Sequence, residues 1–293
     1  MRKFSGTGVA LVTPFHRDGS IDFASLKRLL THTERNVNYF VVTGTTGESA
    51  TLTKEEKKDV LRFVLKNNPK KLPVVYGIGG NNTASVLDEI NTTNLSGVSA
   101  VLSVSPYYNK PSQEGIRQHF KKIADASPVP IILYNVPGRT ASNLTAETTL
   151  SLALHKNIIG IKEASGDIEQ CMRIARGKPK NFLLISGDDL LNVPLYSIGG
   201  GGVISVLANA LPGIFKKITE SARAGNYLKA SIETFKLLEI NKPMYEEGNP
   251  TGVKYLLSLM KICKPFVRLP LVEPSAGLRK KIEKAYSQIE KGN

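Results

Sequence analysis

Hydrophobic residues along the chain gather in short runs rich in β-branched side chains, separated by longer stretches in which apolar positions recur every three or four residues. Such runs are typical of strands buried on both faces, and the longer spacing is typical of amphipathic helices. Successive runs begin at intervals of about 20 to 34 residues. The predicted strands are residues 8–15, 39–43, 73–77, 100–105, 129–135, 158–162, 182–186 and 202–206.

The segments between these strands predict helices. Helical spacing is clearest after the first, second and fourth strands, at Phe23, Leu26 and Leu30, at Val60, Val64 and Leu65, and at Ile116, Phe120 and Ile123. Thr53 and Glu56 form a capping-box pattern ahead of the second helix. Eight alternations of strand and helix predict parallel strands in an α/β fold, a (β/α)8 TIM barrel. A doubly wound open sheet is the competing fold, but the first strand leads into Thr13-Pro14-Phe15 and not into a Gly-x-Gly-x-x-Gly turn.

Beyond Pro212 the strand signals stop and only helical patterns continue. Their apolar positions are Leu228, Ile232 and Phe235, then Val253, Leu257 and Met260, then Leu278, Ile282 and Ala285. Proline-rich joints at residues 242–250 and 265–274 separate these helices. We therefore expect a barrel domain over residues 1–224 and a C-terminal helical domain over residues 225–293. The last two strands are so close in sequence that the helix between them must be short.

Composition is that of an ordinary soluble globular protein, with 41% hydrophobic and 22% charged residues in 293. No apolar run approaches the roughly 18 residues that a membrane span requires, and the N-terminus lacks the apolar core of a signal peptide. We expect a cytoplasmic protein. Two cysteines and four scattered histidines argue against a disulfide framework and against a metal site, so we expect no metal and no cofactor.

The formal net charge of +14 raises the possibility of a nucleic-acid partner. Yet the lysines are spread over helix-like segments without interleaved aromatic residues, as in Lys54, Lys57, Lys58, Lys66, Lys70 and Lys71. No helix-turn-helix, zinc-finger or RNA-recognition pattern accompanies them. We expect solvated helix faces and no nucleic-acid partner, although a positive field would concentrate small anions.

Lys162 ends the sixth predicted strand, in the stretch I-I-G-I-K-E-A-S-G. Burying an ammonium group among apolar residues is costly, and an uncharged amine is the nucleophile that Schiff-base chemistry needs. A lysine at a strand end can also simply extend into water. In a (β/α)8 barrel the chemistry lies at the C-terminal ends of the strands, and that position favours the catalytic interpretation.

Other polar groups follow neighbouring strands. Thr45 and Thr46 follow the second, Tyr107 and Tyr108 the fourth, Tyr134 ends the fifth, and Arg139 comes shortly after it. Each has a plainer interpretation: a tight turn or a phosphate cradle at residues 44–47, packing for the tyrosines, and a surface ion pair for the arginine. Residues 199–202 precede their strand, so close backbone packing explains these glycines better than a phosphate loop. An amine, hydroxyls and a guanidinium at one barrel face together favour an active site.

Several long motifs, in order and over essentially the whole chain, resemble those of the dihydrodipicolinate synthase / N-acetylneuraminate lyase superfamily of class I pyruvate-dependent aldolases. They are G-T-T-G-E-S-A-T-L at 44–52, P-Y-Y-N-K-P at 106–111, Y-N-V-P-G-R-T at 134–140, G-I-K-E at 160–163 and G-V-I-S-V at 202–206. Arg139 is similar to the synthase branch, since neuraminate lyases carry an apolar residue there.

The resemblance implies that Lys162 forms an imine with pyruvate and that the derived enamine attacks L-aspartate 4-semialdehyde. The product would be 4-hydroxy-tetrahydrodipicolinate, on the route to diaminopimelate and lysine. Tyr134 would be the acid/base, with Thr45 and Tyr108 completing a proton relay. For substrate binding, the resemblance implies Thr46 together with Thr45 at the pyruvate carboxylate, Arg139 at the semialdehyde carboxylate, and wall contacts from Gly187 and Ile204.

The resemblance also implies a homotetramer, a dimer of dimers, in which Tyr108 enters the neighbouring subunit's site. Many members bind L-lysine as a feedback inhibitor, and Ser49, Ala50, Gly79, Asn81 and Tyr107 match that site. Inhibited members carry polar or histidine residues where this chain has Lys54 and Lys57, and strongly inhibited ones carry Glu where it has Ser85. Sensitivity to lysine stays open on these grounds.

Two alternatives to the synthase reaction remain open. One is another pyruvate-dependent aldolase of the same superfamily, acting on a sugar acid or a hydroxy-oxo acid. Arg139 argues against it, because a polyol chain needs hydroxyl partners more than a second carboxylate clamp. The other is a non-catalytic barrel that binds a regulatory ligand, which requires an inert Lys162.

Overall fold

Eight parallel strands follow one another in chain order around a closed barrel. The computed structural model describes residues 2–291. The strands are β1 (Gly6–Ala10), β2 (Tyr39–Val42), β3 (Val74–Gly77), β4 (Ala100–Val104), β5 (Ile131–Asn135), β6 (Ile158–Glu163), β7 (Leu183–Ser186) and β8 (Gly202–Ser205). Nearly all their residues are buried, as expected for a sheet covered on both faces. The predicted (β/α)8 barrel is confirmed.

The chain divides into two compact units. The first comprises Pro73–Ile204 together with the N-terminal segment up to Gly6, and the second comprises Thr7–Leu72 together with the chain from Ser205 onward. These units are defined by which parts of the backbone pack together, and they do not test the expected domain boundary at residue 224. That boundary stays a prediction. The last barrel-type helix, α9 (Pro212–Arg223), ends next to that position, and α10 (Tyr227–Phe235) begins just after it.

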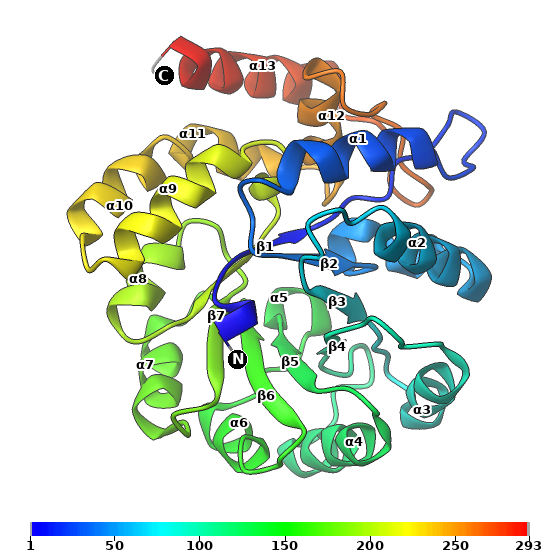
Figure 1. The fold of residues 1–293 in the computed structure, drawn as a ribbon, viewed down its shortest axis with the longest axis vertical. Helices are drawn as coiled ribbons and strands as arrows, with labels where there is room; N and C mark the ends of the chain where they lie inside the picture. Colours follow the sequence, from blue (N-terminus) through cyan, green and yellow to red (C-terminus); the bar gives the residue numbers. More distant parts are fainter. Residues whose placement is uncertain (1, 292–293) are drawn as a thin grey trace. The chain divides into compact units, whose positions relative to one another are not determined.

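In the first unit, helices cover the outer side of the strands (Figure 1). They are α3 (Thr83–Thr92), α4 (Gln113–Ala126), α6 (Ala146–Leu152), α7 (Ile168–Gly177) and α8 (Asn192–Ser197), while the short α5 (Pro137–Thr140) follows the end of β5. Most begin with a side-chain cap, and Asp167, for example, accepts a hydrogen bond from the backbone N–H of Gln170. The six-residue α8 confirms the expected short helix between β7 and β8.

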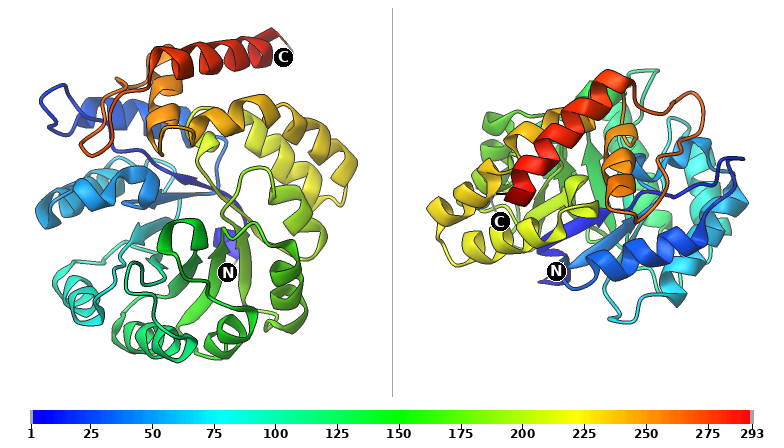
Figure 2. Two further views of the ribbon diagram at one scale, coloured as in Figure 1. Left: turned by 180° about the vertical axis from the view of Figure 1, so that it is seen from behind. Right: turned by 90° about the horizontal axis from the view of Figure 1, so that it is seen from above.

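The second unit holds α1 (Phe23–Thr33) and α2 (Lys54–Lys66) beside the C-terminal helices. The C-terminal helices after α10 are α11 (Leu238–Asn241), α12 (Thr251–Leu259) and α13 (Ala276–Lys291). The Thr53–Glu56 capping box is present at the start of α2, as predicted. In Figure 2, α9 and α10 lie side by side. The short 3-10 helices of the chain are η1 (Arg2–Phe4), η2 (Thr45–Gly47), η3 (Ser49–Thr51), η4 (Leu207–Asn209) and η5 (Lys242–Met244).

The first strand is shorter than the sequence pattern predicts. Pairing with β2 stops at Ala10, residues 11–14 continue as irregular chain, and Phe15 forms an isolated antiparallel bridge with Ile21. The amide of Asn209 explains the change, because it accepts a hydrogen bond from Val12 N (3.1 Å) and donates one to Ala10 O (2.7 Å). A side chain from η4 thus satisfies backbone groups that a strand partner would otherwise bind.

Close backbone packing is confirmed at Gly200 and Gly202, whereas a Cβ on Gly199 would meet nothing within 4 Å. A Cβ on Gly202 would lie 1.9 Å from the carbonyl oxygen of Gly6, and Gly201 O accepts a hydrogen bond from Gly6 N (2.8 Å). Gly202 also has φ +153°, a region that side chains rarely adopt. Gly200 and Gly202 therefore allow neighbouring chain segments to come close at the start of β8.

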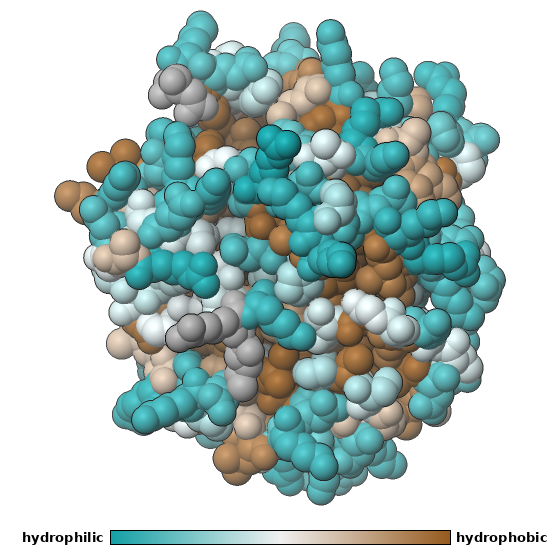
Figure 3. Space-filling view, in the orientation of Figure 1, coloured by the Kyte–Doolittle hydropathy of each residue, from teal (hydrophilic) through white to brown (hydrophobic). Residues whose placement is uncertain are grey.

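Helix α10 exposes several of its apolar residues. Leu228, Ile232 and Phe235 are 75%, 52% and 60% exposed, while α10 buries Ala230 and Thr234. Elsewhere, hydrophilic side chains cover much of the face shown in Figure 3. No helix within residues 2–291 is long and apolar enough to cross a membrane.

Candidate active site

Lys162 and Tyr134 lie opposite each other on adjacent strands, each near the C-terminal end. The pairing of β5 with β6 aligns Tyr134 with Lys162, and the Nζ atom of Lys162 lies 4.2 Å from the centroid of the tyrosine ring. Lys162 is only 6% exposed, and Tyr134 is 7% exposed. Among the described residues no carboxylate forms an ion pair with Lys162. The buried lysine therefore has an aromatic neighbour and, among the described residues, no carboxylate counter-ion.

Gly187 makes room for the lysine side chain. A Cβ at this position would lie 3.1 Å from Cε of Lys162 and 2.5 Å from Cβ of Ala164. The backbone N–H of Gly187 donates to Glu163 O (2.7 Å), which fixes the turn after β7 beside β6. Ile204, near the end of β8, is buried as a wall residue would be.

Arg139 lies on the short helix α5, which follows directly from β5 through Val136 and Pro137. Its side chain is exposed, and within residues 2–291 it forms no ion pair and no hydrogen bond. The alternative interpretation of Arg139, a surface ion pair, is therefore not supported by the described residues. The guanidinium keeps its donors available for an anionic ligand.

Tyr108 projects from the loop after β4. Its side chain is 88% exposed, and its backbone lies in the left-handed region with φ +74°. Side chains with a Cβ seldom adopt this conformation, which costs about 1–2 kcal/mol and is found at functional sites. The loop therefore presents the Tyr108 side chain to solvent.

Thr45 and Thr46 belong to the second unit, where they form the 3-10 turn η2 at the end of β2. Thr46 is buried, and its Oγ1 accepts a hydrogen bond from Nδ2 of Asn249 (3.0 Å). A threonine hydroxyl that accepts one bond still has its own proton to donate. Thr46 is thus able to donate a hydrogen bond to a carboxylate. Thr13 Oγ1 secures the same turn by donating to Gly47 O (2.7 Å).

Glu48, next in the chain, carries a buried ion pair that sequence reasoning missed. Its Oε1 lies 2.5 Å from Nζ of Lys254 on α12, and its Oε2 accepts a hydrogen bond from Arg268 N (3.0 Å). Lys254 also donates to Phe266 O and lies over the ring of Phe15. Burial lowers the pKa of Lys254, and the negative charge of Glu48 opposes that shift. The pair ties the C-terminal helices to the turn that holds Thr45 and Thr46.

A second polar cluster lies on the other face of the sheet from Lys162; two of its residues belong to the sequence motifs, but their role was not predicted. Glu163 and Asn135, the strand neighbours of Lys162 and Tyr134, point to the other face of the sheet, where Gln170 and Asn143 meet them. The strand period of two was the signal that could have found it, because it separates these residues from the pair facing the lysine.

The residues predicted for an L-lysine site lie at loops and turns. In the first unit, Gly79 packs against β4, and Asn81 O accepts a hydrogen bond from the Asn109 amide. Tyr107 is exposed. In the second unit, Ser49 and Ala50 lie in η3. Ser85, on α3, is exposed. The effector site stays a prediction.

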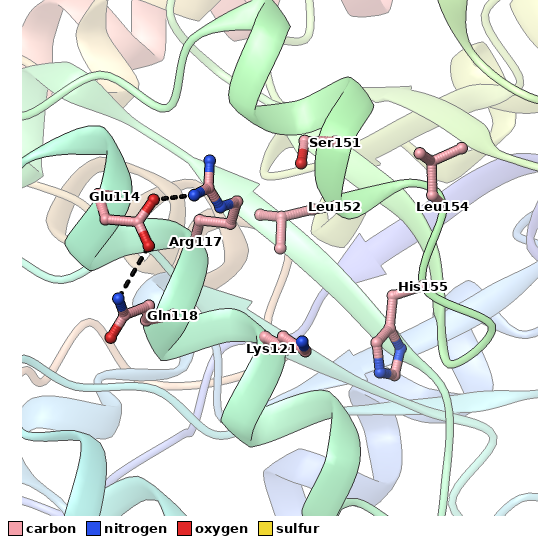
Figure 4. A pocket seen from close by; sticks show the side chains of 8 residues that line it. All are labelled: Glu114, Arg117, Gln118, Lys121, Ser151, Leu152, Leu154 and His155. Atoms are coloured by element: carbon pink, nitrogen blue, oxygen red, sulfur yellow. Dashed lines mark hydrogen bonds and ion pairs between the residues drawn. The ribbon is translucent and has the colours of Figure 1, made fainter.

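A separate hollow of about 600 Å³ lies on the outer side of α4 and α6 (Figure 4). Its lining is Glu114, Arg117, Gln118, Lys121, Ser151, Leu152, Leu154 and His155. Glu114 is bound by both Arg117 and Gln118, as Figure 4 shows. No predicted site residue lines this hollow, so we do not assign the chemistry to it. Within residues 2–291, no three His, Cys, Asp or Glu side chains gather as ligands for a metal ion.

A closed parallel barrel with a buried lysine at a strand end, and a tyrosine ring against its amine, has the architecture of a class I aldolase. The model of the Dihydrodipicolinate synthetase family matches residues 3–289, and the chain belongs to this family.

Named relatives agree with this membership. A 4-hydroxy-tetrahydrodipicolinate synthase of Cytophaga hutchinsonii is 51% identical over 290 residues, which cover 99% of this chain and 98% of the relative. The enzyme of the same name from Flavobacterium psychrophilum is 50% identical over 293 residues, covering 99% and 100%. Among solved structures, the dihydrodipicolinate synthase of Cyanidioschyzon merolae with lysine bound superposes with a TM-score of 0.94 at 37% identity, covering 98% of this chain and 99% of the other. The resemblance inferred from the motifs is confirmed.

Proposed function

We propose that the protein condenses pyruvate with L-aspartate 4-semialdehyde to give 4-hydroxy-tetrahydrodipicolinate, in the synthesis of diaminopimelate and lysine. The observation that carries the proposal is the buried Lys162, 4.2 Å from the Tyr134 ring and without a counter-ion among the described residues, in a chain of this family. Relatives that share half of its residues bear the synthase name.

The chemistry begins when Nζ of Lys162 attacks the keto carbon of pyruvate. Proton transfer to the resulting hydroxyl expels water and leaves an imine, and loss of a methyl proton gives the enamine. The enamine carbon attacks the aldehyde of the second substrate. The substrate's own amine then replaces Lys162 at the imine carbon, which closes the ring and frees the lysine.

The remaining site residues have proposed roles around this sequence. Tyr134 acts as acid and base, and Thr45 and Tyr108 relay its proton. Thr46 donates its hydroxyl proton to the pyruvate carboxylate, which the acceptor role of that hydroxyl toward Asn249 supports. Arg139, whose side chain has no partner among the described residues, binds the semialdehyde carboxylate in bidentate fashion. Gly187 and Ile204 shape the wall.

We further propose that the enzyme works as a cytoplasmic homotetramer, a dimer of dimers. The outward-facing Tyr108 supports this assembly, because a side chain 88% exposed on its own chain is available to a neighbour. L-Lysine binding at the predicted effector residues remains part of the proposal. Ser85 supplies no carboxylate for the ligand's amine, so we expect weak inhibition. Enzyme activity measured while L-lysine is titrated into the millimolar range tests this expectation.

Borohydride reduction in the presence of pyruvate, followed by intact mass, tests the Schiff base. We expect one added pyruvate-derived group on the wild-type chain, none on Lys162→Ala, and full labelling of Lys156→Ala, an exposed control lysine just before β6. An unlabelled wild-type chain would contradict the proposal and would favour a ligand-binding barrel.

A coupled reductase assay identifies the second substrate. Activity with pyruvate and aspartate semialdehyde is the expected result. Activity only with sugar acids or hydroxy-oxo acids would place the protein in another branch of the superfamily. Arg139→Ala separates the branches further: we expect a roughly tenfold or greater rise in the semialdehyde KM with little change in the pyruvate KM.

A further inference from the structure

The β5–β6 ladder contains an irregularity that bears directly on the Lys162–Tyr134 pair. Ile131 pairs with Ile158, but Ile132 pairs with Gly160, so β6 carries one extra residue at this point. In the regular register, Ile161 would lie opposite Tyr134. Since successive side chains alternate between the two faces of a strand, a shift of one residue would exchange the faces of Lys162 and its neighbours.

Side chains beyond the irregularity select the observed register. Asn135 and Glu163 are paired across the ladder directly after Tyr134 and Lys162. Nδ2 of Asn135 donates to both carboxylate oxygens of Glu163, at 3.1 and 3.0 Å, and both residues are buried. These bonds form only when Tyr134 stands opposite Lys162.

The Glu163 carboxylate is surrounded by donors and has no cation. Besides Asn135, Gln170 Nε2 donates to Oε2 (2.9 Å) and Ser165 N donates to Oε1 (2.7 Å). Among residues 2–291 it forms no ion pair. Every contact is an N–H donor, which matches an ionised carboxylate. Burial, and next the charge of Glu163, raises the pKa of the nearby Cys171 thiol to about 12.

Asn143 closes the cluster into a network. Its Oδ1 accepts from Asn135 Nδ2 (2.7 Å), and its Nδ2 donates to Gln170 Oε1 (2.8 Å). Asn135 Oδ1 in turn accepts from Leu144 N (2.9 Å). Each side-chain amide uses both its donor and its acceptor, so the network is rigid and intolerant of a donor facing a donor.

We propose that Glu163, through its bonds to Asn135 and Gln170, is a positioning residue that holds Lys162 against Tyr134 for imine formation. The proposal rests on the proposed function, because it concerns the same lysine. The cluster lies on the face of the sheet opposite the amine, so Glu163 acts on the reaction through the strands and not by contact with substrate.

The test compares Glu163→Gln with a rearranged pair, Asn135→Asp/Glu163→Gln. The single variant places an amide donor against the donors of Asn135 and Gln170. The double variant restores one carboxylate facing one amide once the side-chain amides of Asn143 and Gln170 turn over, so that Asn143 donates to the new carboxylate and Gln170 donates to Asn143. Glu169→Gln on α7 is the matched control, since Glu169 is exposed and paired only at the surface with Arg173. The rate constant of borohydride-trapped imine formation at saturating pyruvate is measured for all four proteins.

We expect Glu163→Gln to slow imine formation roughly tenfold or more, in line with the sensitivity of such chemistry to small misplacements, while pyruvate still saturates the variant within about threefold of the wild-type concentration. The rearranged pair should recover most of the rate, and the Glu169→Gln control should match wild type. Rescue and the split between rate and saturation distinguish positioning from a general loss of stability.

Two results would overturn the inference: wild-type rates in folded Glu163→Gln, or a folded double variant as slow as the single one. Should Glu163→Gln fail to fold, Gln170→Met on the buried side of α7 removes one donor to Glu163, and an unchanged rate there would equally contradict the proposal. If wild type traps no imine at all, the proposed function fails instead, so the two failures are distinguishable.

Discussion

Gly187 is the residue at which a single methyl group most directly perturbs Lys162. In Gly187→Ala the new Cβ would lie 2.5 Å from Ala164 Cβ and 3.1 Å from Lys162 Cε. We expect the lysine side chain to move, with at least a roughly tenfold loss of imine-forming rate and a destabilisation of about 1–3 kcal/mol. Trapping kinetics and urea denaturation measure the two effects.

The matched control for this substitution is Gly213→Ala on α9, where a Cβ would meet nothing within 4 Å. It should leave both quantities close to wild type. A Gly187→Ala enzyme with full imine-forming rate would show that the wall position tolerates the methyl group and that Lys162 is not confined by it.

At the scale of single residues, the sequence predicted Lys162 and Tyr134 but not the hydrogen-bonded cluster around Glu163. Lys162 and Tyr134 each end an apolar run, and the barrel topology places such ends at one face, so both were predicted. Glu163 and Asn135 were visible in the same motifs. Their role depends on the extra residue in β6 and on amide partners from other segments. Strand periodicity specifies a face but does not specify which residues meet there.

Among the elements, α12 is fastened to the turn after β2 by the Glu48–Lys254 pair, and both groups are almost fully buried. Lys254→Met would leave a buried carboxylate without its cation, so we expect a loss of about 3–5 kcal/mol in the free energy of unfolding. Because Asn249 reaches Thr46 from the same C-terminal segment, the variant should also bind pyruvate more weakly. Denaturant unfolding and the pyruvate KM measure these effects.

The double variant Glu48→Gln/Lys254→Met is the informative comparison for this ion pair. It removes both charges and should be less destabilised than the lysine variant alone. Equal losses in the single and double variants would mean that packing around the Lys254 side chain, and not the unpaired charge, accounts for the cost.

Element boundaries show where sequence patterns stop being sufficient. The strands and main helices follow from apolar periodicity, and the start of α2 follows from a local capping box. The end of β1 does not, because Asn209, distant in sequence, takes over its hydrogen bonds. Glu48 and Lys254 are likewise separated by 206 positions. Contacts of this kind depend on the closed fold and leave no local signature.

At the scale of the whole molecule, the buried His119 makes the free energy of unfolding depend on pH. The side chain is buried on α4, where Nδ1 is bonded to the Thr83 hydroxyl, and burial lowers the pKa of His119 from 6.5 to about 4. Between these values the unfolded chain binds a proton that the folded chain does not. Stability should therefore fall as pH falls from 6.5 to 4, with a slope from this group approaching about 1.4 kcal/mol per pH unit.

His119→Gln removes this proton uptake, so its free energy of unfolding should change less over the same pH range. Urea denaturation at half-unit pH steps gives both curves. A second loss is expected at lower pH, because hydrogen bonds from Arg268 hold the pKa of Glu56 at about 2 against 4.5. That contribution is present above pH 4.5 and disappears toward pH 2. Parallel curves for wild type and His119→Gln down to pH 4 would exclude His119 as the source.

The exposed apolar row on α10 bears on the assembly of the proposed tetramer. Leu228, Ile232 and Phe235 face solvent on a helix that packs through Ala230 and Thr234. Contiguous exposed apolar patches are uncommon on monomers and are typical of subunit interfaces. We expect the double variant Ile232→Glu/Phe235→Glu to fold normally but to sediment as a smaller species than wild type. Lys229 is an exposed polar position on the same helix, so the control variant Lys229→Glu should keep the wild-type mass. If the double glutamate variant sedimented with the wild-type mass, the row would lie outside every subunit interface, and its exposure would need another partner to explain it.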